Sequence, residues 1–234
     1  MKLRDYKYYF KKQVVTVSNV HVVGDDFRLI EFSIPDGFTW QAGQHGLFSF
    51  GVKLPNEKSE YPYSISSIME ERVLRIAVKV FPPLNQYKER LLALTTGDTM
   101  VLRGPIGPFR VQDSYSPIVL VAGGIGITPV RAVLKYVTTR HEDQPIHVIY
   151  SSEQEYIYEE ELNALVTAYP KATIDFVRGM DAPKTLTLQY AKQYKEKAYY
   201  YVSGGKQMIL SYKQMLRDQG VPKHRIIHDP FYRF

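Results

Sequence analysis

The chain has 234 residues, which is too long for one small module and fits two domains of ordinary size. It contains no cysteine, which excludes a disulfide framework, a thiolate-bound metal or iron–sulfur centre and a cysteine nucleophile. Its 6 histidines show no metal-ligand spacing, so we expect no metal site. With 30 basic and 24 acidic residues the net charge is +6, which favours an acidic partner.

The N-terminal stretch Met1–Lys12 mixes basic residues with tyrosines and has no apolar run typical of a signal peptide. The longest apolar run, residues 118–122, is far shorter than the about 20 residues that cross a bilayer. A basic arm is one way to bind nucleic acid, but no nucleic-acid motif follows it, which favours a solvated terminal strand. We therefore expect a cytoplasmic protein with no membrane span and no nucleic-acid partner.

The first half of the chain has the pattern of an antiparallel β-domain. Apolar and polar residues alternate in short runs, which are separated by turn residues such as Gly24-Asp25-Asp26 and Pro35-Asp36-Gly37. The pattern predicts one helix at residues 87–94 and six strands, at residues 14–23, 27–34, 47–50, 63–66, 74–80 and 100–103. Six short strands with turn signals predict a six-stranded antiparallel β-barrel, which we assign to residues 1–112.

In the second half, residues 113–234, apolar strands alternate with amphipathic helices. The predicted strands are residues 118–122, 146–150, 173–177, 199–202 and 225–228, and the predicted helices are residues 129–139, 159–168, 187–193 and 206–219. Such βαβ repetition predicts an α/β domain with a parallel sheet, whose ligands lie at the carboxyl ends of the strands. The polar stretch at residues 113–117 marks the expected domain boundary.

A glycine-rich string, Gly123-Gly124-Ile125-Gly126-Ile127-Thr128-Pro129, directly follows the first strand of this second half. Glycines let backbone amides approach a pyrophosphate, Thr128 suits a helix N-cap, and Pro129 suits the first helical turn. The free amides and the positive end of the helix dipole stabilise a phosphate there. The string therefore predicts a nucleotide site in preference to a plain strand-to-helix turn.

Four motifs in order resemble the ferredoxin-NADP reductase family of two-domain flavoenzymes, over residues 10–234. They are the glycine-rich string, Tyr61-Pro62-Tyr63-Ser64, Gly97-Asp98 with Gly104-Pro105-Ile106-Gly107-Pro108-Phe109, and Tyr201-Val202-Ser203-Gly204-Gly205. The resemblance implies a flavin-binding barrel followed by an NAD(P)-binding α/β domain. It also implies an oxidoreductase that passes hydride from NAD(P)H to FAD and then electrons to an acidic carrier such as ferredoxin or flavodoxin.

The resemblance gives several residues a role. In the barrel, Tyr63 would stack on the isoalloxazine ring, and Ser64 would place a hydroxyl near flavin N5, the atom that receives hydride. In the α/β domain, Ser203 would lie beside the nicotinamide where the family often has cysteine, while Gly204 and Gly205 allow close approach of the dinucleotide. Ser64 and Ser203 are thus the candidate catalytic residues. From the residues alone, Tyr63 and Ser64 also fit an ordinary edge strand, and Ser203 also fits a helix cap.

Two departures from the family bear on the flavin. Tyr61 stands where the family has an arginine that pairs with the flavin nucleotide's phosphate, and a phenol supplies no cation. The loop at residues 81–88 lacks the family's glycine and small hydroxyl residue. Lys79 or Lys88 would restore the positive charge. We expect FAD, with FMN or a loosely bound flavin as alternatives.

The C-terminus and the loops after the second and third strands carry the remaining candidates. In the family an acidic residue followed by an aromatic one often closes over the flavin, which makes Asp229 and Phe231 candidates, with Tyr232 and Phe234 as alternatives. A tail packed on the core is the alternative. Arg178, after the third strand, would meet a 2′-phosphate, whereas Ser151-Ser152-Glu153 offers hydroxyls and an acid. Arg178 also fits a solvated loop, but together with the basic charge it slightly favours NADPH.

Two other functions stay open from the sequence. One is the reductase component of an oxygenase, or a ferric or flavin reductase, in which the acceptor differs. Because the chain has no cysteine, any iron–sulfur centre would lie in a separate protein. The other is a non-catalytic nucleotide-binding regulatory or assembly module that has lost flavin, which the changes at Tyr61 and residues 81–88 suggest.

Overall fold

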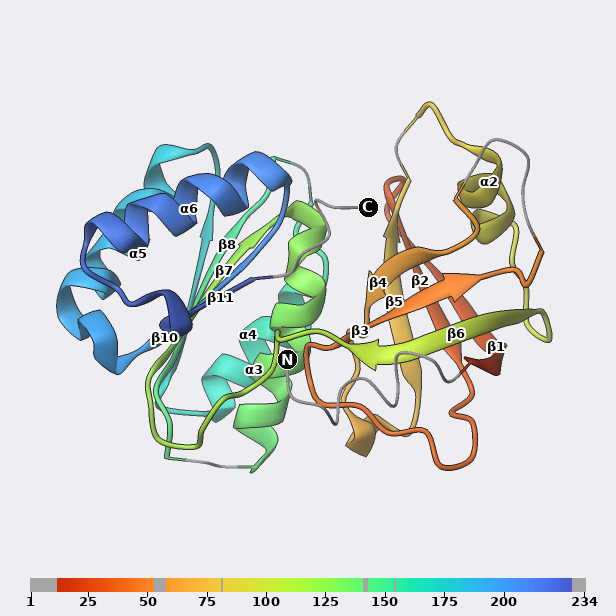
Figure 1. The fold of residues 1–234 in the computed structure, drawn as a ribbon, viewed down its shortest axis with the longest axis horizontal. Coiled ribbons are helices and arrows are strands. Elements are labelled where there is room, and N and C mark those ends of the chain that lie inside the picture. Colours follow the sequence, from red (N-terminus) through yellow and green to blue (C-terminus); the bar gives the residue numbers. More distant parts are fainter. Residues whose placement is uncertain (1–11, 53–57, 81, 141–142, 154, 229–234) are drawn as a thin grey trace. The chain divides into compact units, whose positions relative to one another are not determined.

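The computed structural model describes residues 12–52, 58–80, 82–140, 143–153 and 155–228, and the chain divides into two compact units (Figure 1). The division falls between Gly107 and Pro108, shortly before the polar stretch at residues 113–117. Each unit has its own sheet and its own buried core. None of the helices within the described ranges is long and apolar enough to cross a membrane.

The N-terminal unit is a curled sheet of six antiparallel strands in the order β4-β3-β6-β1-β2-β5. The strands are β1 (Lys12–Val23), β2 (Phe27–Phe32), β3 (His45–Ser49), β4 (Tyr61–Ser64), β5 (Leu74–Lys79) and β6 (Thr99–Ile106). The two edges of the sheet approach each other where Ile65 bridges to Ile76 and the Ser66 N–H donates to the Arg75 carbonyl at 2.8 Å. The predicted six-stranded antiparallel domain is confirmed, in the form of a half-barrel.

The core of the N-terminal unit is made by alternate residues of its strands, which is why the sequence alternates there. Ile30 and Phe32 of β2 point inward and are fully buried, and the Phe32 ring lies 5.5 Å from that of Phe48. Helix α2 (Gln86–Leu92) adds Tyr87 and Leu91 to this core. Burying a side chain of this size contributes about 1.5–3 kcal/mol, so the apolar face fixes the register of each strand.

The C-terminal unit is a parallel sheet of five strands in the order β11-β10-β7-β8-β9. The strands are β7 (Ile118–Gly123), β8 (Ile146–Ser151), β9 (Ala172–Val177), β10 (Tyr199–Ser203) and β11 (Ile226–His228), and the helices are α3 (Ile127–Arg140), α4 (Glu159–Ala168), α5 (Asp181–Tyr194) and α6 (Lys206–Asp218). Helices α3 and α4 pack together on one face of the sheet and α5 and α6 on the other. The parallel α/β domain predicted from the sequence is confirmed.

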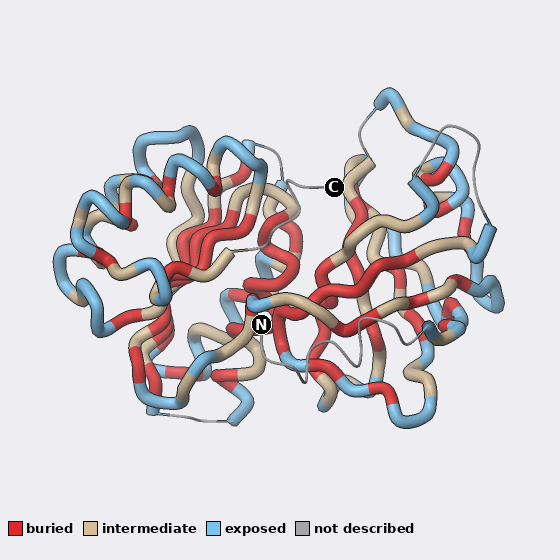
Figure 2. The backbone as a smooth tube through the Cα atoms, viewed as in Figure 1, coloured by how far each residue is buried: buried red, intermediate tan, exposed pale blue. Residues whose placement is uncertain are grey.

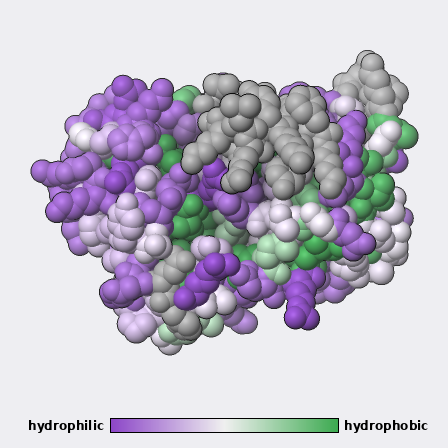
Figure 3. All heavy atoms as spheres, turned by 60° about the horizontal axis from the view of Figure 1, so that its bottom comes forward, coloured by the Kyte–Doolittle hydropathy of each residue, from purple (hydrophilic) through white to green (hydrophobic). Residues whose placement is uncertain are grey.

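Coverage on both faces explains the uninterrupted apolar run of the central strand β7, of which residues 118–122 are all buried (Figure 2). Short 3-10 helices join the main elements; in the described part of the chain they are Met69–Glu71, Gly124–Gly126, Lys195–Lys197 and Lys223–Arg225. Hydrophilic side chains predominate over the C-terminal unit on the face shown in Figure 3. The largest boundary error is in α5, which begins six residues before the predicted residue 187, because its first turn, Asp181-Ala182-Pro183-Lys184, carries few apolar residues.

Candidate functional site

Two glycine-containing turns lie at the same edge of the parallel sheet. One leads from β7 through the 3-10 helix Gly124–Gly126 into α3, and the other leads from Ser203 at the end of β10 into α6. Strands β7 and β10 are neighbours, with Ala122 paired to Ser203, so the two turns are side by side. The structure thus brings together two motifs that lie 80 residues apart along the chain.

Three of the five glycines in these turns lie close to other atoms, and at Gly126 these atoms are backbone of the other turn. A Cβ at Gly126 would lie 2.3 Å from the Ser203 carbonyl oxygen, which is backbone and cannot move aside easily. A Cβ at Gly123 would lie 2.4 Å from the Met208 sulfur, and one at Gly204 would lie 2.7 Å from the same atom. Gly126 therefore serves the packing of the two turns, whereas a side chain at Gly123 or Gly204 would require the Met208 side chain to move.

The other two glycines face open space. A Cβ at Gly124 or at Gly205 would meet no atom within 4 Å. Gly205 is also the N-cap of α6, and no side chain accepts a hydrogen bond there from the first turn of that helix. Open space beside the free amides of a helix N-terminus is a suitable place for a phosphate group.

The role predicted for Thr128 as N-cap is wrong. Helix α3 begins at Ile127, one residue earlier, and Thr128 is a buried residue of its first turn whose hydroxyl donates to the Ile125 carbonyl at 2.7 Å. The 3-10 helix, which starts at Gly124 with a φ of +53°, continues directly into α3 and removes the need for a side-chain cap. Pro129 is buried in the same turn. The sequence predicted the helix but not this continuous entry.

A pocket of about 400 Å³ adjoins the two turns at the carboxyl ends of β8 and β9. Its lining combines apolar side chains with hydroxyl groups and comes from the end of β8, the start of α5 and the first two turns of α6: Ser151, Gly179, Met180, Pro183, Lys184, Gln207, Met208, Ser211 and Tyr212. Met208 connects the pocket to the turns, because its sulfur also lies against Gly123 and Gly204. Sequence reasoning missed Met208 and Tyr212, although their spacing of four residues places them on one face of α6.

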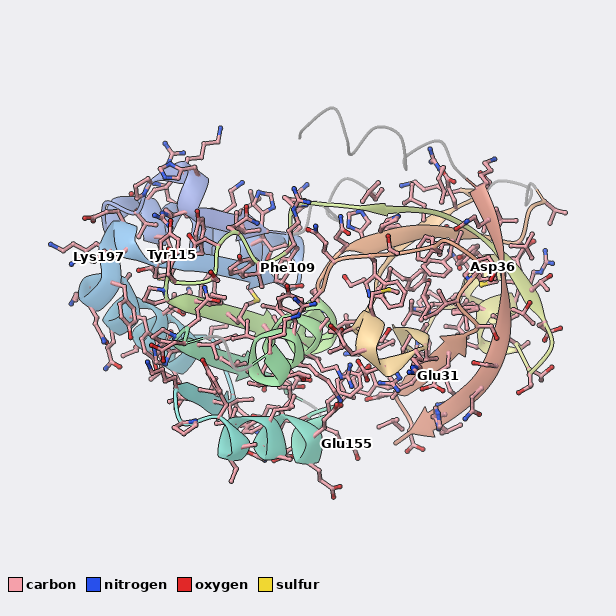
Figure 4. The ribbon with its side chains drawn as sticks, turned by 90° about the horizontal axis from the view of Figure 1, so that it is seen from below. Glu31, Asp36, Phe109, Tyr115, Glu155 and Lys197 are labelled. Carbon is pink, nitrogen blue, oxygen red and sulfur yellow. The ribbon has the colours of Figure 1, made fainter. Side chains whose placement is uncertain are left out.

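Neither Arg178 nor Glu153 lines this pocket, and the two side chains have different partners near it. The Arg178 guanidinium donates to the Glu153 carbonyl at 2.8 Å, lies 5.4 Å from the ring centre of Tyr156, and lines a separate pocket of about 600 Å³. Glutamates dominate that second pocket; Glu155, labelled in Figure 4, is one of them. The Glu153 carboxylate instead accepts the N–H of Gly179, which lines the first pocket, at 2.8 Å.

In the N-terminal unit, Tyr63 and Ser64 of β4 are half-buried and buried, respectively. The Tyr63 ring meets Phe48 edge-on, with centres 6.0 Å apart, and burial, reinforced by Tyr61, raises the pKa of its phenol. Ser64 is buried and pairs across the sheet with His45 of β3. Burial lowers the pKa of His45 to about 4, so this imidazole is neutral at pH 7. Sequence reasoning missed His45, whose one signal is a polar residue within an apolar strand.

The residues predicted to hold the flavin phosphate form a group around the start of α2. The Tyr61 hydroxyl accepts from the Asn85 side-chain amide at 3.1 Å, and the Asn85 oxygen caps α2 by accepting the Lys88 N–H at 2.8 Å. Burial, and secondarily the charge of Lys79, lowers the pKa of the Lys88 amine. Two neighbouring cations beside hydroxyl and amide donors make a donor set that suits an anion.

Two predicted residues, Asp229 and Phe231, lie outside the described residues. Within the described ranges, no three histidine, aspartate or glutamate side chains gather as a metal site would require. Of the other predicted residues, the glycines and Ser203 meet at one edge of the parallel sheet. Tyr61 contacts Asn85 at the start of α2, and Lys79 lies close enough to Lys88 to lower the pKa of its amine.

Comparison with known proteins finds similarity to reductases and to their electron transfer components. Residues 120–214 match the family model of the oxidoreductase NAD-binding domain. The electron transfer component of toluate 1,2-dioxygenase from Pseudomonas putida is 22% identical over 191 residues, which cover 77% of this chain and 56% of that protein. The chain spans about half the length of the curated relatives it matches.

Two solved structures match nearly end to end. The cytochrome b5 reductase domain of Ulva prolifera nitrate reductase superposes with a TM-score of 0.79 at 20% identity, over 94% of this chain and 98% of that one. The ferredoxin-NADP+ reductase from Plasmodium falciparum gives a TM-score of 0.77 at 18% identity, over 93% of this chain and 95% of that one. At these identities the likeness establishes the fold.

Proposed function

We propose that the chain, which belongs by its two-domain fold and its NAD-binding domain to the ferredoxin-NADP reductase family, is a flavin-dependent NAD(P)H oxidoreductase. NAD(P)H binds the C-terminal unit, FAD binds the N-terminal unit, and electrons leave to a separate acceptor protein. The observation that carries this proposal is the pair of packed glycine turns, with open space at Gly124 and Gly205 and a pocket adjoining them.

In the C-terminal unit the dinucleotide would extend from the pocket to the end of β10. The adenosine fits the pocket, where Ser151 offers a hydroxyl and Tyr212 an aromatic ring. The pyrophosphate fits beside Gly124 and Gly205, where backbone amides donate to it without a Cβ in the way. Ser203, at the carboxyl end of β10, would then orient the nicotinamide with a hydroxyl where the family often has a thiol.

In the N-terminal unit the flavin nucleotide's phosphates would bind beside Tyr61, Asn85, Lys79 and Lys88. Their donors and charges fit an anion even though the family's arginine is replaced by Tyr61. Bound flavin would supply the redox chemistry, taking two electrons as hydride and releasing them singly. Tyr63 would pack on the isoalloxazine ring, and Ser64 would place its hydroxyl group, a hydrogen-bond donor, close to N5. The chain's own residues would thus bind the flavin and orient its ring. FMN is the alternative to FAD.

The acceptor we propose is an acidic electron carrier such as ferredoxin or flavodoxin. A net charge of +6 would steer such a carrier towards the chain and make the reaction salt-dependent. A second candidate is the reductase component of an oxygenase, favoured by the toluate dioxygenase relative. The chain itself has no cysteine. Any iron–sulfur centre of such a system would then lie on another protein.

Flavin binding tests the proposal most simply. We expect the full chain, purified and mixed with FAD, to retain yellow flavin absorbance after gel filtration and to quench the fluorescence of added FAD. FMN serves as the competing ligand. A chain that binds neither flavin would contradict the oxidoreductase assignment and leave a nucleotide-binding regulatory or assembly module as the better account.

A further inference from the structure

We infer that the C-terminal unit selects NADH over NADPH and that Glu153 is the specificity-determining residue. The inference rests on the proposed function, because it names which dinucleotide the proposed site takes. It departs from the expectation of NADPH, for which Arg178 was the main ground, and it depends on where Glu153 and Arg178 lie.

The exposed Glu153 carboxylate is hydrogen-bonded to a residue that lines the pocket. Its Oε1 accepts the N–H of Gly179 at 2.8 Å, and the Ser151 hydroxyl donates to the Gly179 carbonyl at 3.1 Å. Gly179 and Ser151 both line the pocket, so the Glu153 carboxylate is hydrogen-bonded to the backbone of a lining residue. The second carboxylate oxygen, Oε2, can accept a hydrogen bond from a hydroxyl group of a ligand.

Arg178 is engaged elsewhere. Its guanidinium donates to the Glu153 carbonyl and lies over the Tyr156 ring. It lines the second pocket together with Glu155 and Glu159, and these acids favour its staying there. Neither Arg178 nor Glu153 is among the residues that line the pocket beside Ser151 and Gly179, but the Glu153 carboxylate is hydrogen-bonded to that lining through the Gly179 N–H.

The chemistry of the ribose then decides between the two dinucleotides. In NADH the adenosine ribose carries a 2′-hydroxyl, which can donate a hydrogen bond to a carboxylate at the end of the second strand. In NADPH a doubly charged phosphate takes that place and is repelled by the same carboxylate. Among the described residues that line the pocket, Lys184 is the one with a basic side chain. It lies in the first turn of α5, and we assign it to the phosphates that NADH and NADPH share.

Nucleotide fragments test the inference without flavin turnover. By isothermal titration, we expect the full chain to bind 5′-AMP at least about tenfold more tightly than adenosine 2′,5′-bisphosphate, since one such charge repulsion is worth a factor of that order. Glu153→Gln should reduce this ratio several-fold. Glu155→Gln, which removes a neighbouring acid from the second pocket, is the matched control and should leave the ratio unchanged. The ratio of KM values for NADPH and NADH should change in parallel.

Two further variants separate the rival explanations. Arg178→Gln should leave the ratio unchanged, and Lys184→Gln should weaken 5′-AMP and the bisphosphate equally. Tighter binding of the bisphosphate by the unaltered chain, or its selective loss in Arg178→Gln or Lys184→Gln, would overturn the assignment to Glu153 while leaving the oxidoreductase proposal intact. If the fragments, NADH and NADPH all fail to bind, the proposed function fails as well.

Discussion

Gly126 lies so close to Ser203 that a Cβ on the glycine would come within 2.3 Å of the serine carbonyl oxygen. This contact joins the turn after β7 to the turn after β10, and it assigns Gly126 to the protein's own packing. Gly205, in contrast, has open space around its missing Cβ and an ordinary negative φ of −63°. The two positions therefore separate the stability of the site from its binding function.

We expect Gly126→Ala to destabilise the C-terminal unit, because the added methyl group meets backbone that cannot move aside. Overpacking of this kind costs about 1–3 kcal/mol. Thermal unfolding followed by circular dichroism should show a lower Tm, with loss of NAD(P)H binding as a consequence. An unchanged Tm would show that the two turns are not packed as described.

We expect Gly205→Ala to keep the stability of the chain and to weaken dinucleotide binding. Alanine fits the backbone conformation at this position, but its methyl group would occupy the space assigned to the pyrophosphate. The KM for the reduced dinucleotide should rise by about tenfold, an effect of about 1.4 kcal/mol. If Gly205→Ala binds the dinucleotide as well as the unaltered chain, the pyrophosphate does not lie there.

The elements of both units follow from the sequence, whereas the contacts between turns do not. Alternation in the first half and βαβ repetition in the second are local patterns, and each is fixed by which face is buried. The division of the glycines into packing and open positions depends on Met208 and Ser203, which are distant along the chain. The hydrogen bond from the Gly179 N–H to the Glu153 carboxylate likewise joins two loops that are distant along the chain. Sequence patterns do not reveal it, and the residue types alone favoured Arg178 as the residue that selects the dinucleotide.

Ser64→Ala tests the assignment of that hydroxyl to flavin N5. We expect flavin reduction by saturating dinucleotide to slow by about tenfold or more, with little change in the dinucleotide KM, since the hydroxyl acts on the flavin side. Ser66→Ala is the control, because Ser66 is equally buried but its hydroxyl donates to the Arg75 carbonyl. Equal effects of the two variants would indicate that Ser64 has only a structural role.

Lys88→Gln should weaken flavin binding if the group around Tyr61 holds the flavin phosphates. Loss of one charge-assisted hydrogen bond corresponds to about 1.5–3 kcal/mol, or at least a tenfold higher Kd for FAD. Fluorescence titration with FAD measures it. Lys12→Gln, an exposed lysine on β1, provides the comparison and should leave the Kd unchanged. If neither Lys88→Gln nor Lys12→Gln changes the Kd for FAD, the flavin phosphates do not bind beside α2.

His45 should make the chain less stable in mild acid. Its pKa is lowered by burial from 6.5 to about 4, so the unfolded chain binds the proton more readily than the folded one. Its contribution to the free energy of unfolding is therefore present above pH 6.5 and is lost as the pH falls to about 4, by about 3 kcal/mol in all. Urea unfolding at several pH values should show this decline.

In His45→Gln the slope of stability between pH 6.5 and 4 should be smaller than in the unaltered chain. His224→Gln, at an exposed position in the 3-10 helix Lys223–Arg225, is the control and should leave the slope as it was. A slope unaffected by His45→Gln would mean that other groups cause the acid sensitivity.

Anaerobic reduction of the bound flavin tests the central proposal most directly. The full chain reconstituted with FAD is mixed with NADH or NADPH in a stopped-flow instrument, and the flavin absorbance is followed. We predict rapid bleaching, faster with NADH, with a rate that saturates as the dinucleotide concentration rises. Flavin that stays oxidised with both dinucleotides, in a chain that binds them, would contradict the assignment of this protein as an NAD(P)H oxidoreductase.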